Sequence, residues 1–264
     1  MQKSFRSVGE HPLLGVPTMS EPDEKSEVSP AGSRILRHGK NEDDWKPPAP
    51  IQNLEEISQH IVAHLGESKT VFHENVSDTV HIDVHLVEPS ARAPFYRLVT
   101  SGMSDLPMNA PQEMKGHEFL ELMVTLPSFW RMDMESFQDE KWYWPLRLLK
   151  GMALFPHKHS TWLGFGHSVP NANPPKSYSR DTHLCGVILL PSVTAPQSFL
   201  SLKISPQKRI GFLSLYPLYR EELEFKLKSG TDRLGDMLFE AGVTDLIDPQ
   251  RKSVVQPKKK FWLF

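Results

Sequence analysis

The order of two hydrophobic periodicities along this chain limits its fold more than any other feature. In residues 80–86, apolar side chains occupy every second position, which is typical of a strand with one buried face. In residues 54–65, apolar side chains instead recur at helical spacing, and Gly66 follows as a stop signal. Strand patterns interrupted by helices, without a regular strand–helix–strand repeat, favour an α+β fold with a mixed, largely antiparallel sheet.

The same reasoning predicts the remaining elements. Further strands are expected at 95–100, 118–126, 162–165, 183–190, 199–204 and 209–215. The last two should form a hairpin through a turn at 205–207. Helices are expected from Pro145 through 154, from Pro217 to about 228, and over 231–241, because proline is well tolerated in the first turn of a helix.

The first fifty residues differ in composition from the rest. They are rich in Pro, Ser, Glu and Lys and have few large apolar side chains, so they cannot bury enough surface to offset the entropy of ordering. We therefore expect a flexible extension over residues 1–50, followed by a single domain over residues 51–264.

Bulk properties exclude several classes of function. The formal net charge is −2 and the pI is near 6.6, so the chain lacks the basic footprint of a nucleic-acid-binding protein. No stretch approaches the roughly 18 apolar residues needed to span a bilayer, and the N-terminus lacks a signal-peptide pattern. Cys185 is the only cysteine, which excludes a disulfide within the chain. We expect a cytoplasmic protein with no membrane or nucleic-acid partner.

One polar group stands out among the strand patterns. His81, Asp83 and His85 would project from one face of a strand, each about 6.6–6.8 Å from the next. Two histidines and a carboxylate can bind zinc or iron, so a metal-assisted hydrolase is one reading. We favour a strand face that contacts a partner, because no recognised zinc, nucleophile or nucleotide motif is present. Asp245 and Asp248 form a second acidic pair, although Asp248 precedes a proline and also fits a turn.

Several long motifs, in order, resemble the Suppressor of fused domain. They are Gly102 to Met108 (GMSDLPM), Glu121 to Trp130 (ELMVTLPSFW), Trp144 to Asn171 and Leu215 to Leu227 (LYPLYREELEFKL), and the resemblance extends from about residue 70 to 255. It implies an α+β domain with a mixed sheet flanked by helices. The animal member continues into a second domain that helps to clamp a zinc-finger transcription factor in Hedgehog signalling. Because this chain ends soon after the matching region, we expect a stand-alone, bacterial-type member.

The resemblance also implies a function. Bacterial members are thought to be immunity proteins, or antitoxins, against secreted polymorphic toxins. It therefore implies a protein without catalytic residues, cofactor, metal or small-molecule substrate. The implied activity is the binding of a protein partner, and one mode of such binding is the addition of a strand to a sheet edge. On this basis His81, Asp83, His85, Asp245 and Asp248 are the expected partner-binding residues. A regulatory scaffold that sequesters a transcription factor is the other binding function considered.

Overall fold

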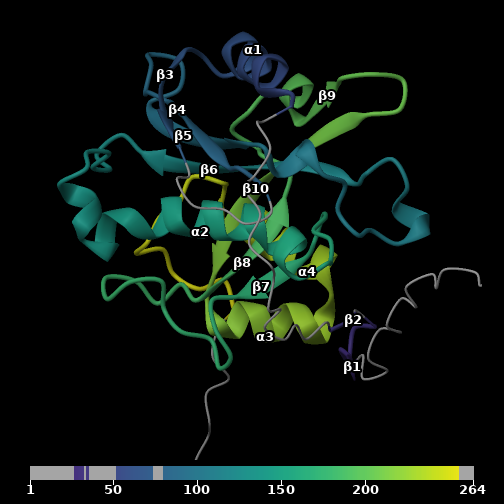
Figure 1. The fold of residues 1–264 in the computed structure, drawn as a ribbon. Coiled ribbons are helices and arrows are strands. Elements are labelled where there is room, and N and C mark those ends of the chain that lie inside the picture. Colours follow the sequence, from purple (N-terminus) through teal and green to yellow (C-terminus); the bar gives the residue numbers. More distant parts are fainter. Residues whose placement is uncertain (1–26, 33, 36–51, 74–79, 256–264) are drawn as a thin grey trace, which may run out of the picture.

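A mixed eight-stranded sheet forms the centre of the fold (Figure 1). The computed structural model describes residues 27–32, 34–35, 52–73 and 80–255. The strands of the sheet run in the order β3-β4-β5-β6-β10-β8-β7, and β9 also pairs with β10. Only the β6–β10 pair is parallel among the strand pairs described for this sheet. The expected α+β fold with a mixed, largely antiparallel sheet is confirmed.

The strand bounds are β3 Ser68–Phe72, β4 Asp83–Val87, β5 Phe95–Ser101, β6 Phe119–Pro127, β7 Ser168–Pro170, β8 Gly186–Leu190, β9 Ser201–Lys203 and β10 Arg209–Leu218. Four α-helices are described: α1 Leu54–His64, α2 Glu140–Lys158, α3 Arg220–Ser229 and α4 Thr231–Glu240. Short 3-10 helices lie at Met103–Asp105 (η1), Gln112–Met114 (η2), Ser136–Gln138 (η3) and Gln197–Leu200 (η4).

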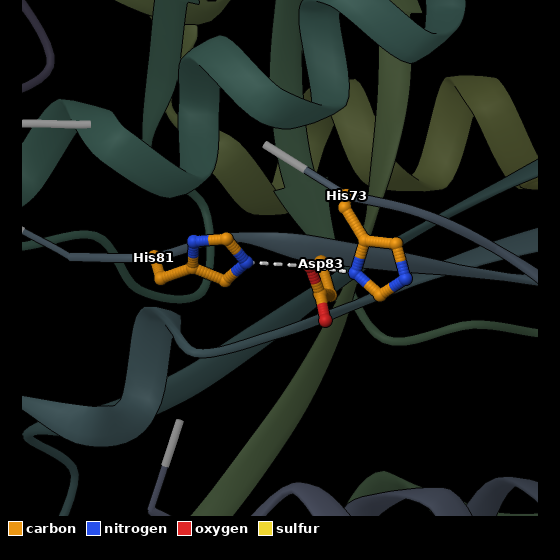
Figure 2. Close-up of side chains that lie close together, drawn as sticks. All are labelled: His73, His81 and Asp83. Atoms are coloured by element: carbon orange, nitrogen blue, oxygen red, sulfur yellow. Dashed lines mark hydrogen bonds and ion pairs between the residues drawn. The ribbon is translucent and has the colours of Figure 1, made fainter. Parts of the chain in front are cut away.

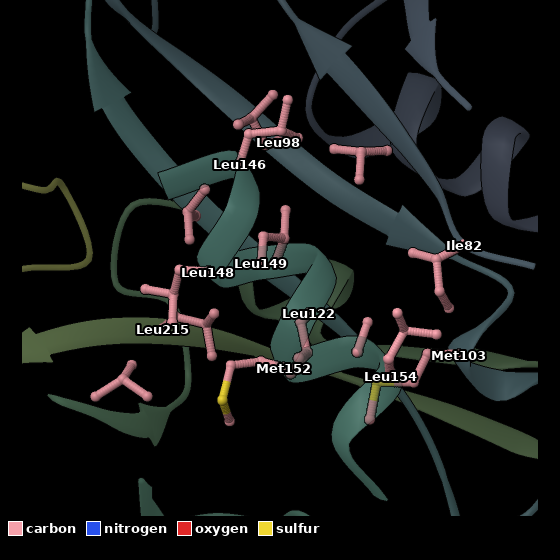
Figure 3. Packing of buried hydrophobic residues seen from close by; sticks show 14 of the residues in the cluster. Ile82, Leu98, Met103, Leu122, Leu146, Leu148, Leu149, Met152, Leu154 and Leu215 are labelled. Carbon is pink, nitrogen blue, oxygen red and sulfur yellow. The ribbon is translucent and has the colours of Figure 1, made fainter. Parts of the chain in front are cut away.

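Both faces of the sheet are buried, because apolar side chains point to each side of the central strands. On β6, Leu122 and Val124 belong to the core beneath α2, whereas Met123 points to the opposite face and packs in the core that includes Ile57 and Ile61 of α1. Figure 3 shows the α2 side, where leucines of the helix meet strand residues. A smaller apolar cluster joins α3 and α4 to β8 and β10.

Helix α2 begins five residues earlier than the prediction from Pro145. Asp139 is its N-cap, and the Asp139 carboxylate accepts a hydrogen bond from the backbone N–H of Lys141 at 2.9 Å. Pro145 and Pro156 both lie inside the helix. The capping aspartate, rather than the proline, therefore marks the helix start.

Pro217 does not open a helix as predicted. It lies in β10, where it pairs with Val187 of β8, and α3 starts at Arg220. The N3 residue Glu222 accepts a hydrogen bond from the N–H of the N-cap residue Tyr219 at 2.9 Å, which fixes that start. Residues 162–165 are not a strand, whereas β3 and β7 were not predicted. The β9–β10 hairpin is confirmed.

Most of the expected extension lies outside the described residues. Two short strands within it, β1 Glu27–Val28 and β2 Arg34–Ile35, pair antiparallel, and the N–H of Ala31 donates to the carbonyl of Leu227 in α3 at 3.2 Å. The boundary at residue 50 stays a prediction. Among the helices that can be described, none has the length and apolar character needed to cross a bilayer.

Candidate functional site

Three polar side chains meet where β3 ends and β4 begins. Asp83 is the first residue of β4, and its Oδ1 lies 2.9 Å from Nδ1 of His73 and 2.9 Å from Nε2 of His81 (Figure 2). His73 directly follows β3, so the cluster joins the ends of two neighbouring antiparallel strands. We call His73, His81 and Asp83 the His–Asp–His cluster.

The cluster is open on one side and buried on the other. The side chain of His73 is 63% exposed, that of His81 28% and that of Asp83 only 4%. A buried carboxylate is costly unless it is paired or hydrogen-bonded, and the two imidazoles supply those contacts. The three possible ligand atoms all lie within 4.8 Å of one another. The arrangement can therefore share protons or hold a cation.

His85 is not part of this cluster, although the strand pattern placed it on the same face as His81 and Asp83. Its Nε2 lies 2.9 Å from Oγ of Ser101 on the neighbouring strand β5, and the residue is 2% exposed. Burial lowers the pKa of His85, so the neutral imidazole is favoured. His81 itself precedes β4 and is not part of the strand.

A buried glutamate lies at the same end of the sheet, and the sequence patterns did not predict it as a site residue. Glu121 of β6 accepts hydrogen bonds from Oγ1 of Thr100 at 2.6 Å, and from Oγ and N of Ser104 at 2.6 and 2.9 Å. Burial outweighs these bonds and raises its pKa to about 7. The sequence indication was that Glu121 is the only charged residue in the segment 119–127, on the same face as Phe119 and Met123.

Asp245 and Asp248 lie in a different part of the fold from the His–Asp–His cluster. Asp245 is fully buried and accepts hydrogen bonds from β6, β10 and the loop after β8; the donors are Oγ1 of Thr125, Oγ of Ser192, N of Val193, N and Oγ1 of Thr194, and Oγ of Ser214. Asp248 is exposed and accepts from the N–H of Gln250 at 2.9 Å, as expected for a turn. Asp245 thus fastens a loop to the sheet.

The outer edge of β3 borders the cluster. β3 is the last strand on its side of the sheet and pairs only with β4 among the described strands. Its central residues Lys69 and Thr70 are exposed. An edge strand presents unpaired backbone N–H and C=O groups that another chain can pair with. Two surface depressions, one near Tyr178 and one near Tyr219, include none of the predicted site residues.

Comparison with known proteins identifies relatives of this domain. A family model described as Suppressor of fused protein (SUFU) matches residues 78–252. A crystal structure of a SUFU homolog from Neisseria gonorrhoeae is similar, with a TM-score of 0.53 and 16% identity over 77% of this chain and 97% of that chain. The crystal structure of the Sufu–Fu complex gives a TM-score of 0.55 and 15% identity, covering 78% of this chain and 93% of that chain. No curated protein matched.

Proposed function

The chain belongs to the Suppressor of fused protein family, and from that premise we propose that it is a non-enzymatic domain that binds a protein partner. One similar structure is a complex, that of Sufu with Fu. The resemblance in sequence to stand-alone bacterial members supports a narrower role, that of an immunity protein which occludes a cognate polymorphic toxin. The bacterial SUFU homolog, of which 97% is covered, supports that comparison at the level of the fold.

The outer edge of β3, which pairs only with β4 among the described strands, carries this proposal together with the neighbouring His–Asp–His cluster. A partner segment can add to the edge as a further strand, and its backbone would pair with the groups that β3 leaves free. At the end of that edge the exposed imidazole of His73 and the half-buried imidazole of His81 offer side-chain contacts. Backbone pairing supplies affinity in this mode of recognition, and contacts to alternate side chains of the added strand supply specificity.

The five expected partner-binding residues divide by burial into two roles. His81 and Asp248 are accessible and can contact a partner directly. Asp83, His85 and Asp245 are buried, at 3%, 2% and 0% exposure, so they act by positioning their neighbours. Acidic and histidine-rich surfaces suit a basic nuclease toxin, because complementary charges speed and orient association.

The arrangement of the buried carboxylates also supports a binding role over an enzymatic one. Glu121 and Asp245 each accept several hydrogen bonds from the protein itself and are fully buried. A general acid or base must reach the proton that it transfers, and neither carboxylate is accessible. A hydrolase built on His81, Asp83 and His85 loses support, because His85 is directed to Ser101.

A tagged full-length chain, used to capture partners from its own host lysate, tests the proposal. We expect one stoichiometric protein that carries a toxin domain, whose toxicity is neutralised when this chain is co-expressed. Recovery of a transcription factor instead would assign a regulatory scaffold and overturn the immunity role. Recovery of no protein at all would contradict the binding function itself.

A further inference from the structure

We propose that His73, His81 and Asp83 form a binding site for one divalent transition-metal ion of the zinc class. This inference departs from the expectation of a metal-free domain, and it does not depend on the proposed function. It also differs from the metal site suggested by the strand pattern, because His73 replaces His85 as the third ligand.

The geometry is already close to that of a metal centre. Zinc binds imidazole nitrogen and carboxylate oxygen at about 2.0–2.2 Å, which places ligand atoms of a tetrahedral site roughly 3.3 Å apart. Here Oδ1 of Asp83 lies 2.9 Å from each ring nitrogen, and no pair of ligand atoms is more than 4.8 Å apart. An ion bound to all three atoms requires each ring nitrogen to move slightly away from Oδ1 and the two nitrogens to lie about 3.3 Å from each other. The exposed side chain of His73 has room to make this movement.

The convergence on a single oxygen is the second observation. Both histidines direct a ring nitrogen at Oδ1 of Asp83 (Figure 2). The side chain of Asp83 is only 4% exposed. In the metal-free state each of these nitrogens must carry a proton to donate to the carboxylate. A cation at the same point can replace both hydrogen bonds with coordination bonds. On metal binding, the single proton of each neutral imidazole leaves the coordinating nitrogen through exchange with solvent and is carried on the other ring nitrogen.

The donor set selects the class of ion. Imidazole suits zinc, copper, iron and nickel, whereas magnesium and calcium favour sites made entirely of oxygen ligands. The electrostatic surroundings are mixed: Asp105 interacts with His81, while Nζ of Lys150 donates to the backbone carbonyl of His73 at 3.3 Å. Asp105 also interacts with Lys208, so two carboxylates are balanced by two ammonium groups, and the surroundings do not oppose a divalent cation.

Such an ion would connect the end of β3 to the start of β4. Three protein ligands also leave at least one coordination position open, as zinc sites with bound water do. That position could accept water or a side chain of another molecule. The site would then lie at the end of the sheet edge that the proposed function assigns to a partner.

Metal binding can be measured directly on the purified, metal-stripped full-length chain. We would titrate it with Zn²⁺ by calorimetry, and with Co²⁺, whose visible spectrum reports coordination by nitrogen and oxygen. The decisive variants are His73→Ala and His81→Ala, since both side chains are at least partly exposed. Asp83→Asn is a third variant, and circular dichroism and melting temperature check that each one folds. His117→Ala, which removes an exposed histidine outside the cluster, is the matched control.

We expect one equivalent of Zn²⁺ in the wild type and in His117→Ala, and a loss of affinity of about 100-fold or more in His73→Ala and His81→Ala. Loss of a group that merely orients a ligand already costs 10–100-fold. Equal affinity and stoichiometry in the wild type and in His73→Ala would overturn the site, as would the absence of stoichiometric binding. Neither result would bear on whether the chain binds a protein partner.

Discussion

At the scale of single residues, buried carboxylates connect parts of this chain that are far apart in sequence. Asp83 pairs with a histidine ten residues away, Glu121 with the turn after β5, and Asp245 with a loop more than fifty residues earlier. Each of these contacts replaces hydrogen bonds to water that the carboxylate loses on burial. The stability of the fold should therefore be sensitive to these residues.

Asp245 should be the more important member of the acidic pair for stability. Asp245→Ala leaves the N–H groups of Val193 and Thr194 and several hydroxyl groups without their acceptor. We expect the free energy of unfolding to fall by about 3 kcal/mol. Asp248→Ala, at an exposed turn, should lower it by only about 0.5 kcal/mol. Urea denaturation of both variants checks the difference, and equal losses would contradict the described network.

Glu121 predicts a defined pH dependence of stability. Burial raises its pKa from 4.5 to about 7, so between these values the folded state holds a proton that the unfolded state has released. Stability due to this group is therefore fully present below about pH 4.5 and is lost as the pH rises through 7, at up to about 1.4 kcal/mol per pH unit.

The variant Glu121→Gln should remove this pH dependence, because the amide stays neutral and can hydrogen-bond to the same groups. Urea unfolding at a series of pH values between 4.5 and 8 measures it. The unfolding free energy of the variant, minus that of the wild type, should rise with pH across this window. Glu113→Gln, at an exposed position, is the control. A difference that stays constant with pH would show that Glu121 is ionised throughout.

At the scale of helices and strands, caps and ion pairs determine the element ends more than prolines do. The sequence predicts that Pro145 and Pro217 both open helices, yet one lies inside α2 and the other in β10. Proline permits a helix start but does not require one, whereas a cap satisfies backbone groups that otherwise lack partners. Asp139 and Glu222 provide those contacts here.

The cap of α2 can be tested by substitution. Asp139→Ala removes the acceptor for the N–H of Lys141 and should lower the free energy of unfolding by about 1 kcal/mol. Asp139→Asn keeps an acceptor oxygen at the same place and should be nearly neutral. The two variants can be compared by thermal denaturation, and an equal loss in both would indicate a role for the charge and not for the cap.

The segment after α4 is fastened to α3 by an ion pair. Nη2 of Arg251 lies 2.5 Å from Oε2 of Glu222, and the two side chains are 10% and 0% exposed. Arg251→Ala would leave this glutamate buried without its cation, so we expect a loss of about 3 kcal/mol in the free energy of unfolding. Lys252→Ala, at the exposed neighbouring position, should have little effect. Similar urea midpoints for the two variants would contradict the importance of the pair.

At the scale of the whole molecule, the sequence patterns predicted the interior better than the edges. Strands β5 and β6 are buried on both faces and were found from their apolar residues. The edge strands β3 (SKTVF) and β7 (SVP) are short and polar or contain proline, so their patterns are weak. The candidate site was only partly predicted for a related reason. His73 reaches Asp83 only through the pairing of β3 with β4, and no local sequence pattern reveals that pairing.

The central claim is that the outer edge of β3, which has no partner strand among the described residues, binds a protein. Within the regular part of β3, the N–H groups of Thr70 and Val71 point in opposite directions, one toward β4 and one outward. Proline at the position whose N–H points toward β4 removes a hydrogen bond of the sheet and should lower the melting temperature. Of Thr70→Pro and Val71→Pro, the variant that keeps the wild-type melting temperature has therefore lost only the outward N–H, which an added strand would need. The most direct measurement is the amount of partner captured from host lysate by the wild type and by that variant. The account predicts a partner held by the wild type and lost from the variant; equal capture by both would contradict it.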